Sequence, residues 1–113
     1  MISFKCEPDV KGRFYILALD KGVEVGFAHA LYIPNTQTLV LLESEIKEQY
    51  RGQGLGTQLY LEVVKEVKLE NKGKSLTFIP DYLHGGKTNQ SALRLWDSLA
   101  RRFKSSSHKI YIP

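Results

Sequence analysis

Cysteine is almost absent from this sequence: the 113 residues contain one, Cys6, so no disulfide can form within the chain. Such a composition is typical of a reducing compartment. Cys6 belongs to a short run, residues 2–6, whose composition favours a strand. We therefore expect Cys6 to be a buried strand residue rather than a reactive thiol.

Long apolar runs and a strong charge of one sign are also missing. No stretch approaches the roughly 20 apolar residues that a membrane helix needs, and no basic segment followed by an apolar one opens the chain. Sixteen lysines and arginines against twelve acidic residues give a net charge of +4, which suits an anionic ligand but does not require nucleic acid. We expect a soluble, cytoplasmic protein with no membrane, nucleic-acid or metal partner.

Three runs in the first half of the chain predict strands. Residues 13–19 are almost continuously apolar and aromatic, which favours a strand buried on both faces. The turn residues 20–22 separate this run from residues 23–33, which are rich in valine, phenylalanine, tyrosine and isoleucine and predict its hairpin partner. A third strand is predicted from Thr38 to about Ile46.

The apolar period changes from two to about 3.6 residues after this third strand. An amphipathic helix ending near residues 71–73 is predicted by a repeat of every fourth residue, at Leu55, Leu59, Val63 and Val67. Residues 75–79 predict a short strand, and Thr88 or Asn89 is expected to cap a second helix. The apolar stripe of that helix is Ala92, Leu95, Trp96, Leu99 and Phe103.

A last, short edge strand is predicted at residues 108–112. Antiparallel hairpins come first in this order of elements, and a parallel crossover follows. The sequence therefore predicts an α/β (α+β) fold: a mixed, mostly antiparallel central sheet with two main helices, in a single domain over residues 1–113.

The residues with the most chemical meaning form a glycine-rich turn, Arg51-Gly52-Gln53-Gly54-Leu55-Gly56-Thr57, between a strand and the long helix. Glycines at alternate positions permit backbone angles that are closed to other residues. Successive amide groups can then face one concavity at the positive end of a helix, where phosphate oxygens bind. A plain sharp turn is the alternative. The run does not match a P-loop or a dinucleotide-binding motif.

Together with the second helix, this turn resembles the GNAT (Gcn5-related N-acetyltransferase) superfamily. The family's turn is Gln/Arg-x-x-Gly-x-Gly/Ala, and its three fixed positions are filled here by Arg51, Gly54 and Gly56. Downstream the family shows Asn-x-x-Ala-x-x-Leu-Tyr with a later phenylalanine, matched by Asn89, Ala92, Leu95 and Phe103. The resemblance covers about residues 13–103 and implies a minimal member of the family.

The resemblance implies acetyl-coenzyme A as the acyl donor. Amides of residues 52–57 would hold its diphosphate, and the backbone around residues 44–46 would pair with its pantetheine arm. The implied cofactor-binding residues are Glu45, Ile46, Arg51, Gly52, Gln53, Gly54, Gly56, Thr57 and Asn89. A simple helix cap is the alternative role for Asn89.

The sequence departs from the family where the chemistry takes place. Trp96 replaces the tyrosine that usually assists the departing thiolate. An indole donates a hydrogen bond but does not ionise usefully near neutral pH. The alternative is that Trp96 is only a residue of the core. Leu42 stands where several members carry an acid. Its neighbour Glu43 is our first candidate for the general base, because a bulge often found in this strand changes which face a side chain joins.

His84 is the second candidate for the catalytic base, since imidazole titrates in the right range. An ordinary loop histidine is the alternative there, and a solvated strand-end carboxylate is the alternative for Glu43.

The two helices that this family normally inserts between its first two strands have no room here, because only about residues 7–12 are available. The acceptor cleft is therefore expected to be open, or completed by a second subunit in a homodimer. The sequence predicts an enzyme that moves acetyl from acetyl-coenzyme A to a primary amine by direct attack, the acceptor being a small molecule, a protein or another large substrate. A catalytically weak or inactive acetyl-coenzyme A-binding module is the alternative, and a basic nucleic-acid binder is a weaker one.

Overall fold

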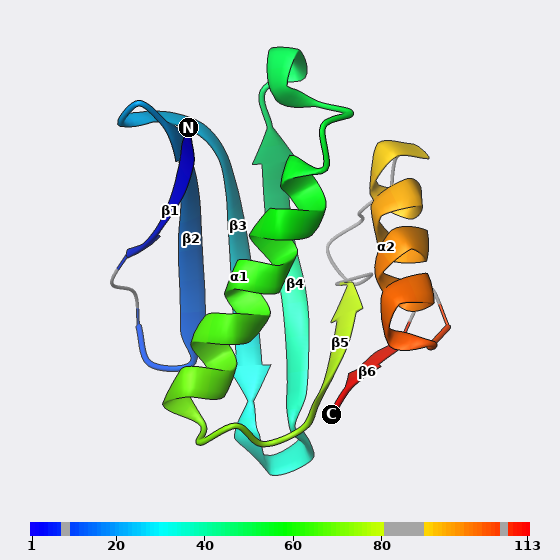
Figure 1. The fold of residues 1–113 in the computed structure, drawn as a ribbon. Coiled ribbons are helices and arrows are strands. Elements are labelled where there is room, and N and C mark those ends of the chain that lie inside the picture. Colours follow the sequence, from blue (N-terminus) through cyan, green and yellow to red (C-terminus); the bar gives the residue numbers. More distant parts are fainter. Residues whose placement is uncertain (8–9, 81–89, 107–108) are drawn as a thin grey trace.

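The computed structural model describes residues 1–7, 10–80, 90–106 and 109–113 (Figure 1). Its strands are β1 (Ile2–Glu7), β2 (Arg13–Asp20), β3 (Val23–Ile33), β4 (Thr38–Ile46), β5 (Leu76–Pro80) and β6 (Ile110–Ile112). The helices are α1 (Leu55–Glu70), between β4 and β5, and α2 (Gln90–Phe103), between β5 and β6. Short 3₁₀ turns at Pro34–Thr36 and Glu48–Tyr50 flank β4.

The strands form one sheet in their order along the chain, from β1 to β6. Neighbouring strands pair antiparallel except β4 and β5, which run parallel because α1 carries the chain back across the sheet. The predicted mixed, mostly antiparallel sheet with two main helices is confirmed. No helix in the described part of the chain is long and apolar enough to cross a bilayer.

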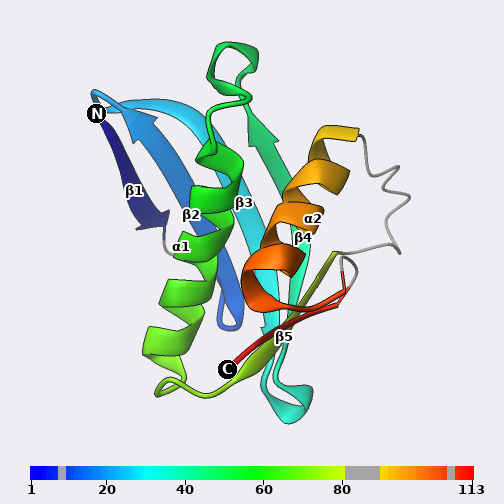
Figure 2. The same ribbon diagram turned by 45° about the vertical axis from the view of Figure 1, so that its right-hand side comes forward.

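Both helices cover the same face of the sheet, as Figures 1 and 2 show. The four leucines and valines predicted to form the apolar stripe of α1 are all buried. Tyr60 of α1, Phe78 of β5 and Trp96 of α2 join the two helices to the sheet, with ring centroids 5.0–5.7 Å apart. This cluster holds α1 and α2 at a fixed position relative to β5, next to the end of β4.

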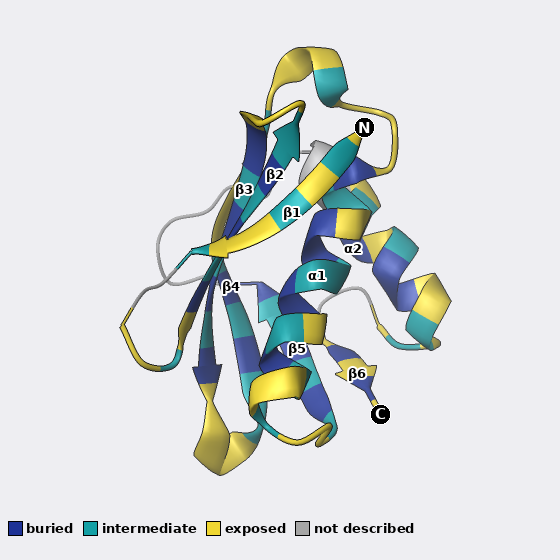
Figure 3. Ribbon diagram, turned by 60° about the vertical axis from the view of Figure 1, so that its left-hand side comes forward, coloured by how far each residue is buried: buried dark blue, intermediate teal, exposed yellow. Residues whose placement is uncertain are grey.

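The opposite face of the sheet carries no helix among the described residues (Figure 3). Along β2, Phe14, Ile16 and Ala18 are buried against the helices, whereas alternate residues such as Tyr15 and Leu17 are half-buried. The prediction that this strand is buried on both faces was therefore wrong. Its second face is apolar in sequence, but no described helix covers it.

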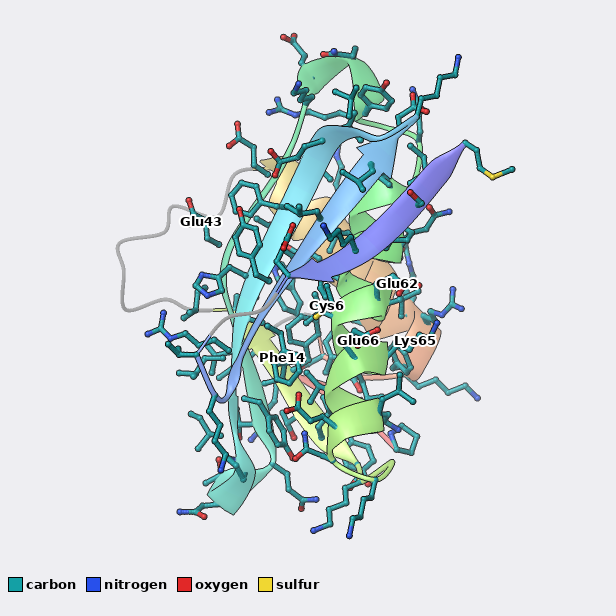
Figure 4. All side chains as sticks on the ribbon, turned by 90° about the vertical axis from the view of Figure 1, so that its left-hand side faces the viewer. Cys6, Phe14, Glu43, Glu62, Lys65 and Glu66 are labelled. Carbon is teal, nitrogen blue, oxygen red and sulfur yellow. The ribbon has the colours of Figure 1, made fainter. Side chains whose placement is uncertain are left out.

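Cys6 is exposed, so the prediction of a buried cysteine was also wrong. Among the described residues β1 pairs only with β2, at an edge of the sheet that α1 covers in part: Ile2 and Phe4 pack against the core, whereas Cys6 is exposed. Partial burial, followed by the charges of Glu66 and Glu70, raises the pKa of the Cys6 thiol. Figure 4 shows Cys6 on the side of the sheet where α1 lies. A raised pKa fits the expectation that this thiol is not a nucleophile.

The remaining boundaries differ little from the predictions. β5 begins one residue later than expected and includes Pro80, and β6 is limited to residues 110–112. In the second predicted stripe, Trp96 and Leu99 are buried and Leu95 and Phe103 are partly buried against the core. The expected cap at Thr88 or Asn89 lies outside the described residues.

Candidate functional site

The glycine-rich turn connects β4 to α1 through two residues in left-handed conformation. Gly52 has φ +78° and Gly54 has φ +79°, in the region that favours glycine. Gly54 is the N-cap of α1, and no side chain caps the helix. The first helical hydrogen bond runs from the Gln58 N–H to the Gly54 carbonyl (3.1 Å). Within the described part of the chain, the three preceding amides therefore have no backbone partner and lie at the positive end of the helix.

A cavity of about 340 Å³ opens beside these amides. Residues of the turn form one wall, and α2 forms the other with Arg94, Leu95 and Ser98. The full lining is Ile46, Tyr50, Arg51, Gly52, Gly54, Leu55, Gly56, Thr57, Arg94, Leu95 and Ser98. Two guanidinium groups and the head of α1 thus surround one cavity, which is the charge pattern that a diphosphate requires.

The third glycine of the turn is needed for a different reason. A Cβ atom on Gly56 would lie 2.4 Å from Cδ1 of Leu95, far inside van der Waals contact. Its backbone φ does not lie in the left-handed region. Gly56 therefore lets α2 pack against the first turn of α1, which brings Arg94 and Ser98 to the cavity.

Three side chains fix the turn to its surroundings. The Arg51 Nε donates a hydrogen bond to the Ile46 carbonyl (2.9 Å), which ties the turn back to the end of β4. Tyr50 donates through its hydroxyl to Asp20 (2.6 Å), and this bond is the main cause that holds the pKa of the Asp20 carboxyl below its ordinary value. Gln53 donates to the Gln49 carbonyl (3.3 Å).

In the described part of the chain, one edge of β4 is open next to this cavity. The pairing of β4 with β5 ends at Leu41 and Pro80 among the described residues, so positions 42–46 extend beyond it. The Lys47 N–H donates to the Val25 carbonyl on β3. Because successive residues of a strand direct their backbone groups to opposite sides, the N–H and carbonyl groups of Ser44 and Ile46 face away from β3. The main chain of Glu45 instead faces β3, where it pairs with Phe27.

A bulge in β4 decides where Glu43 points. Glu43 pairs with His29 while Leu41 pairs with Ala30, which leaves Leu42 as the extra residue. Without the bulge, alternation from the buried Leu41 would direct Glu43 toward α1. The expected bulge is thus confirmed, and it directs Glu43 to the face opposite α1, where Figure 4 shows it exposed.

Glu43 lies beside an aromatic group on this face. Tyr15 stacks on Phe27 (5.4 Å between centroids) and meets His29 edge-on (5.5 Å). Burial first, and then the carboxylates of Glu24, Glu43 and Glu7, raise the pKa of Tyr15. Three carboxylates therefore act on Tyr15, although the chain as a whole carries a net charge of +4.

Of the predicted residues, the cavity is lined by Ile46, Arg51, Gly52, Gly54, Gly56 and Thr57. Glu45 and Gln53 are not part of its lining, and Glu43 lies on the opposite face of the sheet. His84 and Asn89 lie outside the described residues. Trp96, only 3% exposed, occupies the core between Tyr60 and Phe78. No group of three or more His, Cys, Asp or Glu in the described ranges is placed to hold a metal ion.

Sequence reasoning missed Arg94, Ser98 and Tyr50 as residues of the cavity. Nothing in the charge of Arg94 distinguishes it from the other basic residues of the two helices. The available signal was that Arg94 and Ser98 are four residues apart and flank Leu95, and therefore share one face of α2.

The sequence profile of the acetyltransferase (GNAT) family matches residues 3–100. No curated protein sequence gives a significant match. Among solved structures, nourseothricin acetyltransferase superposes with a TM-score of 0.59 and 20% identity, over 96% of this chain and 68% of its own.

Two further acetyltransferase structures have the same fold. The IAA acetyltransferase of Bacillus cereus has a TM-score of 0.65 and 16% identity, over 87% of this chain and 75% of its own. The diaminobutyrate acetyltransferase of Paenibacillus lautus, solved with L-2,4-diaminobutyric acid and coenzyme A, has a TM-score of 0.61 and 19% identity, over 80% of this chain. This chain spans about half (51%) of that protein. The profile match covers most of the sequence, and the chain therefore belongs to the GNAT acetyltransferase family.

Proposed function

We propose that this protein is an acetyl-coenzyme A-dependent N-acetyltransferase that binds its donor in the cavity at the head of α1. The observation that supports this most is the combination of uncapped amides at residues 55–57 with Arg51 and Arg94 around one cavity. The diphosphate of the donor carries the opposite charge and accepts hydrogen bonds from such amides. Gly52, Gln53, Gly54, Gly56 and Thr57 are the other residues of the proposed diphosphate site.

The pantetheine arm is proposed to run along the open edge of β4. Its amide groups would pair with the outward-facing backbone of Ser44 and Ile46, in the way that an added strand pairs with a sheet edge. The Ile46 carbonyl also accepts a hydrogen bond from Arg51 of the proposed diphosphate site. The end of β4 would therefore lie next to both the diphosphate and the pantetheine arm of the donor. Glu45 would not pair with the pantetheine arm itself, because its main chain faces β3. Asn89 is a further proposed contact of the donor.

The acetyl transfer that we propose is a direct attack. The neutral amine nitrogen forms a bond to the thioester carbonyl carbon, the carbon–sulfur bond breaks, and its electron pair leaves with sulfur as the thiolate of coenzyme A. The proton lost from the amine goes to Glu43, directly or through water. His84 is retained as the second candidate base. Coenzyme A supplies the activated acetyl group, and the chain supplies position and proton transfer.

The acceptor is proposed to approach across the face that carries Glu43. The carboxylates of Glu24, Glu43 and Glu45 lie there with the stacked rings of Tyr15 and Phe27, which favours a cationic acceptor through charge and cation–π attraction. Lys47 also lines the hollow formed by Glu24, Phe27 and Glu45, where the carboxylates outnumber it. A large acceptor suits the face, because no described helix encloses it. A homodimer formed symmetrically through the same face would bring these carboxylates against one another, which is unfavourable.

Thermal melting and thiol release test the proposal together. Acetyl-coenzyme A at 100 times its dissociation constant should stabilise the fold by about 2.7 kcal/mol. Thiol release should then appear with a basic peptide or a diamine, and Glu43→Gln should reduce its rate at saturating donor without changing the ligand-induced stabilisation. Glu70→Gln, which removes an equal charge from the far end of α1, is the matched control. Absence of any stabilisation by the donor would refute the proposal.

One observation favours a second function, a donor-binding module without catalysis. Trp96 replaces the tyrosine of the family and is packed in the core, so it offers no hydroxyl to a departing thiolate. Such a module would gain stability from acetyl-coenzyme A and release no thiol with any amine. The enzyme would do both.

A further inference from the structure

Tyr60 is a buried tyrosine whose hydroxyl reaches the open edge of β4. Its ring is 2% exposed and packs against Phe78 of β5 and Trp96 of α2. The hydroxyl lies 2.7 Å from Oγ of Ser44 on β4, and either oxygen can be the donor. The Tyr60 side chain thus runs from α1, past Phe78 of β5, to Ser44, which lies beyond the last pair of β4 and β5 in the described part of the chain.

Ser44 forms the exposed end of this pair. It lies three residues beyond Leu41, the last β4 residue that pairs with β5, and its side chain faces α1. Unlike Tyr60, Ser44 is exposed. Because each hydroxyl has a single hydrogen and one of the two is used between them, the pair retains one O–H for an outside acceptor. The burial of Tyr60 favours Tyr60 as donor to Ser44, which leaves the hydrogen of the exposed Ser44 hydroxyl available to an outside acceptor.

Glu43 and Ser44 are neighbours and therefore point to opposite faces of β4. Glu43 lies on the acceptor face, and Ser44 lies on the face of α1 and the donor cavity. A thioester held along the edge of β4 would present its carbonyl carbon to an amine on the first face, while its sulfur, which continues into the pantetheine arm, would lie on the side of the donor cavity. The position of Ser44 relative to the proposed base is therefore that of a group beside the leaving sulfur.

We infer that Ser44 donates a hydrogen bond to the departing thiolate and that Tyr60 positions Ser44 for this role, supplying from α1 the assistance that Trp96 cannot give. The inference rests on the proposed function, since it requires the donor to run along β4. Ser44 would be the catalytic residue, and Tyr60 would be a positioning residue that acts through it.

The protonation state of Tyr60 fits a donor rather than an acid. Burial, partly offset by the bond to Ser44, raises its pKa to about 12. Tyr60 therefore keeps its proton throughout the pH range in which a thiolate leaves. No proton passes to sulfur in the step itself: the thiolate forms, accepts the hydrogen bond, and takes its proton from solvent afterwards.

The test measures the pKa of the coenzyme A thiol when it is bound to the full chain, by titrating its ultraviolet thiolate absorbance. A hydrogen bond to the thiolate should place this pKa below that of free coenzyme A. Ser44→Ala should raise it by about one unit, since a bond to a charged group changes an equilibrium roughly 10- to 100-fold. Tyr60→Phe should raise it by less, and the double variant should match Ser44→Ala, because the two act as one unit.

Two variants serve as controls. Ser44→Thr keeps the hydroxyl and should keep the low pKa, whereas Tyr32→Phe removes a hydroxyl from another buried tyrosine on β3 and should change nothing. The inference would be overturned if the bound thiol had the same pKa as free coenzyme A, or if Ser44→Ala left a lowered pKa unchanged. Failure of coenzyme A to bind at all would instead overturn the proposed function. A shifted pKa in a chain that transfers no acetyl would support the inference and point to the inactive module.

Discussion

Replacing Gly56 by alanine tests the contact that shapes the donor cavity. The added Cβ would lie 2.4 Å from Cδ1 of Leu95, whereas carbon atoms in contact prefer about 3.5–4.0 Å. The Leu95 side chain must therefore move by more than about 1 Å. Overpacking of this kind costs about 1–3 kcal/mol, and the better helix propensity of alanine returns up to about 1 kcal/mol. We expect a net loss of about 1–2 kcal/mol.

The displaced leucine should also affect the ligand. Leu95 and Gly56 line the same cavity, so movement of Leu95 changes the space available to the diphosphate. Urea unfolding gives the stability and isothermal titration with acetyl-coenzyme A gives the affinity. We expect both to fall in Gly56→Ala, and we expect Leu95→Ala to cancel most of the steric loss when the two are combined, as a double-mutant cycle would show.

Gly54→Ala is the informative comparison. Nothing lies within 4 Å of a Cβ at that position, but its φ of +79° strains an alanine. Its loss of stability should therefore not depend on Leu95. If Gly56→Ala is instead more stable than the parent and binds the donor equally well, α2 does not pack against α1 as described.

Three further predictions follow from the site and its charges. Arg94→Ala should weaken acetyl-coenzyme A binding about ten-fold or more, because a charge-assisted hydrogen bond is lost. Arg101 is exposed at the other end of α2, and Arg101→Ala should leave the affinity unchanged. Equal losses of affinity in calorimetry would contradict the assignment of Arg94 to the cavity. The pKa of Tyr60 is raised to about 12, so the contribution of its protonated form to stability is complete below the ordinary tyrosine value of about 10 and is lost as the pH rises toward 12. In the parent protein the urea concentration at the unfolding midpoint should therefore fall over this pH range, and in Tyr60→Phe it should fall less. The pKa of Asp20 is lowered chiefly by the hydrogen bond from Tyr50, so the ionised Asp20 stabilises the fold above the ordinary aspartate pKa and this stabilisation is lost in acid. Asp20→Asn should therefore lower the melting temperature more at pH 7 than at pH 3. An equal loss at both pH values would contradict this explanation.

The local parts of the fold could be predicted because their signals are contained in short stretches of sequence. The repeat of every fourth residue in α1 and the glycines before it are such signals, and the structure contains both. β2 shows the limit: its residues are apolar on both faces, and only the position of the helices decides that Phe14 is buried and Tyr15 half-buried. Sequence alone does not say that both described helices lie on the same face of the sheet.

The parts of the candidate site that were missed depend on contacts between distant elements. Arg94 reaches the cavity because Leu95 packs on Gly56, and this depends on the crossing of two helices. The Tyr60–Ser44 bond joins residues that no periodicity links. Glu43 was found because the bulge that directs it was expected from the family resemblance. Its catalytic role, like that of His84, stays a prediction.

The central claim is that the amides at the head of α1 bind the diphosphate of acetyl-coenzyme A. Its most direct test is a ¹⁵N–¹H correlation spectrum recorded during titration with the donor. We expect the amide signals of Gly52, Gly54, Gly56 and Thr57 to shift in a saturable way, while those of residues 66–70 at the other end of the helix stay in place. Unmoved glycine signals, at donor concentrations that shift signals elsewhere in the chain, would contradict it.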